Sequence, residues 1–179
     1  MFIFGHIGIT LGTFYLLSRL FPKTEQTFDY RYVAFGALLP DLIDKPLGRI
    51  ILAEAIGGGR IFAHTLLFGC LLLLAGYWLY REKRSSTPLL IPGAAFCHLL
   101  EDRMWNSPNV FLWPLFGREF PKDRIGGNFF EYFMIILDRA YDPAFTTVFV
   151  SEFIGFVIIL AFSINYFRIQ RKNINRKTV

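Results

Sequence analysis

Two side chains that can bind a metal stand four residues apart in the apolar stretch 93–103. His98 and Asp102 occur there in the sequence GAAFCHLLEDR. On a helix this spacing places both side chains on one face, one turn apart. An imidazole and a carboxylate in apolar surroundings are costly unless a partner compensates them, and a divalent metal ion would compensate both. The chemistry expected of this stretch is therefore metal binding.

The two remaining histidines also lie in apolar runs, each near the start of a predicted helix. His6 lies in the run 2–21, and His64 lies in the run 61–80. The first run also carries small residues on one helix face, which would let a neighbouring helix approach closely. These small residues are Gly5, Gly8 and Gly12.

Two further carboxylates follow Pro40 in the sequence LLPDLIDKP, at Asp41 and Asp44. Proline disrupts a helix interior, so we expect the helix to break near Pro40. A broken helix at membrane depth normally lines a site or a water-filled cavity. The alternative is that Asp41 caps a new helix over residues 42–56.

The composition indicates a membrane protein. The chain has 179 residues, of which 54% are hydrophobic and 18% charged, and its mean hydropathy is +0.41. This is too apolar for an ordinary soluble domain. The net charge of +5 suits a protein among anionic lipids. Nucleic acid is not an expected partner, because the basic residues are not interleaved with an aromatic platform.

We predict an all-α fold, a multi-pass transmembrane helical bundle of about five spans. A span needs about 20 apolar residues. Residues 129–142 are too short and too charged for this, so we expect an interfacial helix there. Residues 1–170 would form one integral membrane domain, followed by a basic cytoplasmic tail over 171–179. The expected spans are 2–21, the broken segment that runs through 32–39 into Pro40, 61–80, 88–102 and 145–167.

Loop charges predict the orientation. Lys and Arg accumulate on the cytoplasmic side of membrane proteins. The basic segment 81–84, the loop 22–31 and the C-terminal tail are therefore placed inside. This topology requires that 129–142 does not cross the bilayer. All three histidines and the three carboxylates then reach the outer face of the cell membrane.

Such a set of three imidazoles and three carboxylates could hold two transition-metal ions, and we expect one to three divalent ions per chain. The ligand types suit Zn, with Fe or Mn as alternatives. A bound metal ion can activate water for attack on an ester. Lys45, Arg60 and Arg103 would suit an anionic substrate such as a phosphoester, and Asp44 could act as the base. Glu101 faces another side of its helix and is expected to be structural or to support a ligand.

Five short motifs occur in an order that resembles a known family. They are GH at 5–6, LLPDLID at 38–44, AHT at 63–65, HLLED at 98–102 and SPNVFLWP at 107–114. Together they resemble membrane-bound, metal-dependent hydrolases of the YdjM type over roughly residues 1–120. The resemblance implies a di- or trinuclear metal centre, because the family is similar in ligand order to zinc-dependent phospholipase C. Carried over by position, the implied metal ligands are His6, Asp41, Asp44, His64, His98 and Asp102.

Two positions depart from the pattern of that family. Lys45 and Gly59 stand where the family often has histidines. Those losses would weaken one metal position or replace it with a cation for the substrate.

The function predicted is that of an integral membrane metal-dependent hydrolase. Its substrate would be a phosphoester of a membrane lipid or of a lipid-linked molecule. One alternative is a divalent-cation transporter, which usually has repeated halves and polar groups throughout the membrane depth. No internal repeat stands out in this sequence. The other alternative is a non-catalytic membrane scaffold with a structural metal in closed coordination.

Overall fold

The structure, a computed structural model, describes residues 1–21, 28–122, 129–144 and 146–177. Within these residues the regular elements are all helical, which confirms the predicted all-α class. The elements are α1 (Ile3–Leu20), α2 (Tyr30–Pro46), the π-helix η1 (Leu47–Ile51), α3 (Leu66–Lys83), α4 (Thr87–Glu101), the 3₁₀-helix η2 (Met104–Asn106), α5 (Pro108–Phe111), α6 (Phe129–Tyr141) and α7 (Thr146–Lys177).

Two of the described helices are long and apolar enough to cross a membrane, judged by length and composition. They are Ile3–Leu20 and Thr147–Arg168. The other predicted spans are shorter or more charged, so the structure does not support five spans. The 15 residues of α4 extend only about 22 Å, less than the ~30 Å core of a bilayer. The helix expected over 61–80 begins at Leu66 and ends in the charged residues 81–83.

The helix break predicted near Pro40 is wrong. Pro40 lies inside α2, which continues to Pro46. Close packing outweighs the local cost of the proline, because Gly36 one turn earlier lies against α4. A Cβ on Gly36 would come within 2.5 Å of the Ile91 carbonyl oxygen. The alternative helix over 42–56 is wrong too: η1 ends at Ile51 and turns follow it.

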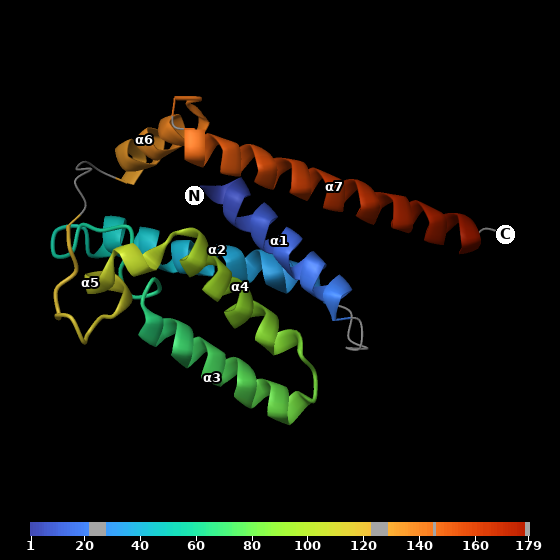
Figure 1. Cartoon of the computed structure of the whole chain (residues 1–179), viewed down its shortest axis with the longest axis horizontal. Coiled ribbons are helices and arrows are strands. Elements are labelled where there is room, and N and C mark those ends of the chain that lie inside the picture. Colours follow the sequence, from blue (N-terminus) through green and yellow to red (C-terminus); the bar gives the residue numbers. More distant parts are fainter. Residues whose placement is uncertain (22–27, 123–128, 145, 178–179) are drawn as a thin grey trace.

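The helices pack in two close pairs, α1 with α7 and α2 with α4 (Figure 1). The glycine stripe of α1 lies at the first of these contacts. A Cβ built on Gly8 would overlap the Gly155 backbone, and one on Gly12 would lie 3.3 Å from Ile158. The contacts advance in the same direction along both helices, so α1 and α7 run parallel. The expected close approach of a neighbouring helix is thereby confirmed.

A buried carboxylate from α7 caps the start of α1. The Glu152 side chain is only 2% exposed. The backbone amides of Phe2, Phe4 and Gly5 donate to its two oxygens at 2.7, 2.9 and 3.0 Å. The first amides of a helix have no partner within the helix, and its N-terminus favours negative charge. Glu152 therefore fixes the turn of α1 that leads into His6.

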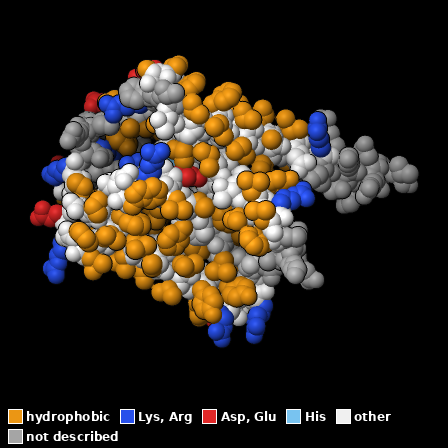
Figure 2. Space-filling view, in the orientation of Figure 1, with side chains coloured by type: hydrophobic (Ala, Val, Ile, Leu, Met, Phe, Trp, Pro, Cys, Tyr) orange, Lys and Arg blue, Asp and Glu red, His pale blue; other side chains and the backbone are white. Residues whose placement is uncertain are grey.

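The helix expected over 129–142 matches α6, and α7 continues as helix to Lys177. The predicted tail at 171–179 therefore begins within α7. Its last residues, 178–179, lie outside the described residues, as do 22–27 of the loop that the charge pattern places inside. Figure 2 shows hydrophobic side chains over much of one face, with most Lys and Arg side chains at its margins. An apolar surface of this extent suits contact with lipid.

Replacing Glu152 with Ala should destabilise the protein by about 3 kcal/mol, since buried amides would lose their acceptor at ~1–3 kcal/mol for an unsatisfied group. Thermal unfolding in detergent, followed by tryptophan fluorescence, measures the effect. Glu152→Gln should fall between Ala and wild type because one acceptor oxygen remains. Ser151→Ala is the matched control, since within the described part of the chain that hydroxyl donates to Val148 of its own helix. Equal melting temperatures for the Glu152→Ala and Ser151→Ala proteins would contradict the capping role.

Candidate metal centre

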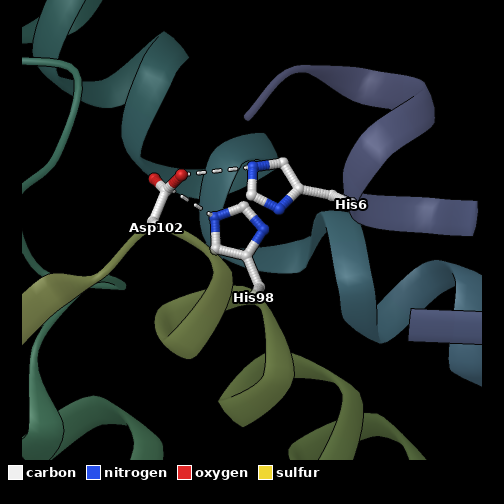
Figure 3. Close-up of side chains that lie close together, drawn as sticks. All are labelled: His6, His98 and Asp102. Atoms are coloured by element: carbon white, nitrogen blue, oxygen red, sulfur yellow. Dashed lines mark ion pairs between the residues drawn. The ribbon is translucent and has the colours of Figure 1, made fainter. Parts of the chain in front are cut away.

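His98 lies at the centre of a buried cluster of imidazoles and carboxylates. It belongs to two groups, one with His6 and Asp102 and the other with Asp41 and His64. In each group, one potential ligand atom per residue lies within 4.8 Å of the others. Figure 3 shows the first group, in which both imidazole rings face the Asp102 carboxylate. All three histidines are fully buried.

Four segments of the chain deliver these side chains. His6 lies one turn into α1, Asp41 lies in the last turns of α2, and His98 lies in the last turn of α4. His64 precedes α3 and lies outside the helix, whereas the sequence pattern places it in a first helical turn. The structure thus brings together five of the six metal ligands expected from the sequence.

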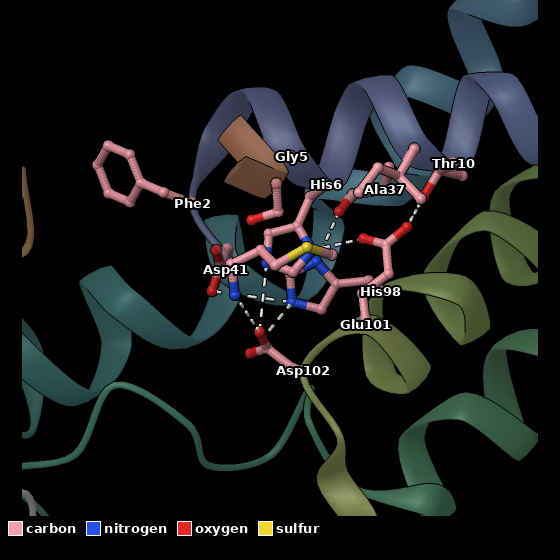
Figure 4. Close-up of polar contacts among 12 residues, drawn as sticks. Phe2, Gly5, His6, Thr10, Ala37, Asp41, His98, Glu101 and Asp102 are labelled. Carbon is pink, nitrogen blue, oxygen red and sulfur yellow. Dashed lines mark hydrogen bonds and ion pairs between the residues drawn. The ribbon is translucent and has the colours of Figure 1, made fainter. Parts of the chain in front are cut away.

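The Nδ1 atom of each imidazole lies within hydrogen-bonding distance of an oxygen atom, on the side of the ring opposite Nε2. The His98 Nδ1 lies 2.7 Å from the carbonyl oxygen of Ala37, which can only accept a hydrogen bond. The His6 Nδ1 lies 2.7 Å from Glu101 Oε2, and the His64 Nδ1 lies 2.7 Å from Asp44 Oδ2. Figure 4 shows the contacts around His6 and His98. A proton on each Nδ1 satisfies these contacts and leaves the Nε2 lone pair available.

The Nε2 atoms of the three rings face the interior of the cluster. The Nε2 atoms of His64 and His98 lie 3.2 Å apart. Two lone pairs at this separation repel each other unless a proton or a metal ion lies between or beside them. The His6 Nε2 is buried and has no hydrogen-bond partner among the described residues. A buried nitrogen without a partner beside two facing imidazole nitrogens is what a metal site requires, so the residues fit a divalent ion.

Two carboxylates reach the same nitrogens. Asp102 Oδ1 lies 3.3 Å from the His6 Nε2, and Asp102 Oδ2 lies 3.7 Å from the His64 Nε2. Asp41 Oδ1 lies 3.7 Å from the His64 Nε2 and 3.9 Å from the His98 Nε2. The cluster therefore combines imidazole and carboxylate donors, the set that suits Zn, Fe or Mn.

Asp44 binds the segment that leads into α3. The backbone amides of Ile61, Ala63 and His64 donate to its carboxylate at 2.7, 2.8 and 3.1 Å. Its Oδ2 also contacts the His64 ring. Asp44 belongs to neither ligand group and instead anchors the segment before α3. Asp41 and Asp44 thus contact opposite nitrogens of the His64 ring, Asp41 on the Nε2 side and Asp44 at Nδ1.

Two of the three predicted cations contact the cluster. The Nε atom of Arg60 lies 2.8 Å from Asp102 Oδ2, and this side chain is 49% exposed. Lys45 Nζ donates to Asp41 Oδ2 at 2.6 Å. The described contacts join these two side chains to the cluster, whereas the Arg103 side chain is exposed on the turn that follows Asp102.

Electrostatics keeps the Arg60–Asp102 pair ionised. Burial alone would raise the pKa of the Asp102 carboxyl, but the adjacent His6 imidazole and the charge of Arg60 hold the pKa well below its usual value. Burial opposes the charge of Arg60 as well, and Asp102 nevertheless raises the pKa of the guanidinium. Asp102 is thus a carboxylate at neutral pH, the form that binds a metal ion.

The sequence patterns did not identify two residues that position His6. Thr10 donates to Glu101 Oε1 at 2.9 Å, which holds the carboxylate that orients His6. Glu152 caps the turn that leads into His6. The available signals were a threonine one turn after His6 and an acidic residue within the apolar stretch 145–167. Glu101 itself has the supporting place expected from its side of the helix.

An all-helical chain with two apolar helices and a buried imidazole–carboxylate cluster at their N-terminal ends has the features of a membrane protein with a candidate metal centre. A model of the YdjM inner membrane protein family matches residues 1–174, and the chain belongs to that family. No curated protein and no solved structure matches the chain significantly.

Replacing His98 with Ala should abolish metal binding, because this residue belongs to both groups. Elemental analysis of the purified protein measures the metal content per chain. Cys97→Ala is the matched control: it lies next to His98 on α4, and its thiol belongs to neither group. Wild-type metal content in the His98→Ala protein would refute the assignment.

Replacing Glu101 with Gln should weaken metal binding about 10–100-fold while every proposed ligand remains, since the acceptor that orients an imidazole tunes its affinity. Competition with a chromophoric chelator measures the dissociation constant. Glu82→Gln, an exposed acid at the end of α3, is the control. If the Glu101→Gln and Glu82→Gln proteins bind metal equally well, Glu101 does not support His6.

Proposed function

We propose that this protein is an integral membrane metal-dependent hydrolase. Its substrate would be a phosphoester of a membrane lipid or of a lipid-linked molecule. It would hold one to three divalent ions, zinc first and Fe or Mn as alternatives. The observation that carries the proposal is the convergence of three Nε2 atoms on two carboxylates, with each ring held by an oxygen behind it.

His6, His64, His98, Asp41 and Asp102 would hold the metal. A bound divalent ion supplies Lewis acidity, which polarises a phosphoryl oxygen and lowers the pKa of water. Arg60 is half exposed beside the Asp102 carboxylate, so it can bind an anionic group of the substrate. Asp44 already accepts hydrogen bonds from three backbone amides and the His64 ring. We therefore propose that Asp44 positions His64 and does not act as the general base.

The position of the cluster supports a substrate at the membrane boundary. His6 lies one turn from the N-terminal end of α1, and Glu152 ties that end to α7. The C-terminal ends of α1, α3 and α7 lie towards the opposite side (Figure 1). Those ends carry Arg19, Arg81, Lys83 and Arg168. By the positive-inside rule they would be cytoplasmic, with the cluster at the outer face.

Purified protein in detergent tests the proposal through metal content and the hydrolysis of a phospholipid panel. We expect bound metal together with cleavage of at least one phosphoester, both lost after chelation. Metal without hydrolysis would contradict the proposal. Metal flux into proteoliposomes would then indicate a transporter, and the absence of flux would indicate a structural metal.

Replacing Arg60 with Ala should lower kcat/KM about 30-fold, because a charge-assisted hydrogen bond contributes ~2 kcal/mol. Arg60→Lys should recover part of the loss, since it keeps the charge but not the planar fork. Arg81→Ala, on the last turn of α3, removes an equal charge far from the cluster and is the control. Equal kcat/KM values for Arg60→Ala and Arg81→Ala would contradict a role in substrate binding.

A further inference from the structure

A cavity of about 190 Å³ lies between the start of α1, the end of α2 and α6. Its walls are apolar side chains except for two charged residues, Asp41 and Lys45. Leu38 and Leu42 form part of the α2 wall, and Ile136 lies in the α6 wall. A cavity of this composition favours a hydrocarbon ligand with charge at one end only.

One carboxylate, that of Asp41, belongs both to the charged end of the cavity and to the cluster of imidazoles and carboxylates. Asp41 Oδ1 faces the His64 and His98 nitrogens, while Oδ2 accepts the hydrogen bond from Lys45. The Lys45 ammonium also lies 5.5 Å from the centre of the Phe2 ring, another wall of the cavity. Lys45 is 23% exposed, so an incoming anion can reach it.

We infer that this cavity binds one hydrocarbon chain of an anionic amphiphile, whose charged head group lies against Lys45. The inference rests on the proposed function and names the part of the substrate that would give affinity. At ~30 Å³ for each water-sized group, the cavity holds about six such groups, which is a segment of one chain. Each methylene buried there should tighten binding about fourfold until the cavity is full.

Photo-cross-linking tests the inference without requiring hydrolysis. The full-length protein in detergent is labelled with decyl phosphate that carries a diazirine at the chain end. Label should concentrate on the α2 and α6 peptides that line the cavity. Unlabelled butyl, hexyl, octyl and decyl phosphate should compete with increasing strength. Equal competition by butyl and decyl phosphate would overturn the chain site, even if phosphate binds at the cluster.

Leu42→Trp fills the cavity and should reduce labelling about tenfold or more, the loss of several buried methylenes. Leu42 is 54% exposed, so the larger ring is accommodated without unfolding. Ile136→Trp blocks the cavity from the α6 side and provides a second variant. Leu71→Trp is the matched control, since Leu71 lies on α3 and is 56% exposed.

Labelling that persists in both cavity variants, or that spreads evenly over α3 and α7, would overturn the inference. The two proposals fail separately. Competition that strengthens with the chain length of the competitor, without hydrolysis of any lipid, supports chain binding in the cavity and contradicts the hydrolase proposal. Hydrolysis together with competition that does not depend on chain length supports the hydrolase proposal and overturns chain binding in the cavity.

Discussion

The cluster depends on one arrangement: each imidazole has its Nδ1 fixed by an oxygen behind it. Ala37, Glu101 and Asp44 supply these oxygens, each at 2.7 Å. The rings then turn their Nε2 atoms towards one another, which is unfavourable for three neutral imidazoles on their own. A bound cation would convert that repulsion into coordination. The fold therefore buries polar groups in an arrangement that a positive charge between them would satisfy.

The framework around the cluster is built to hold those segments in place. Glu152 fixes the first turn of α1 on α7, and Gly8 and Gly155 let the two helices meet backbone to backbone. Asp44 accepts hydrogen bonds from backbone amides of the segment before α3 and so fixes the position of His64. These contacts join parts of the chain that are distant in sequence, so the site exists only when the whole bundle is folded.

Much of the site followed from residue types and spacing. The interval between His98 and Asp102 predicted a shared face, and loop charges predicted that the other histidines reach the same end. The predicted break at Pro40 follows a local rule about proline in helices, and the packing of Gly36 against α4 overrides that rule. The place of Asp44 depends on amides 17 to 20 residues away. Glu152 meets Gly5 across 147 positions, a contact that no local pattern contains.

X-ray absorption at the zinc K-edge of zinc-loaded protein shows whether the converging imidazoles bind a divalent metal ion. The arrangement predicts nitrogen and oxygen ligands at about 2.0–2.1 Å with outer-shell scattering from more than one imidazole. A spectrum with oxygen ligands alone and no imidazole scattering would show that the metal binds elsewhere and would contradict the account.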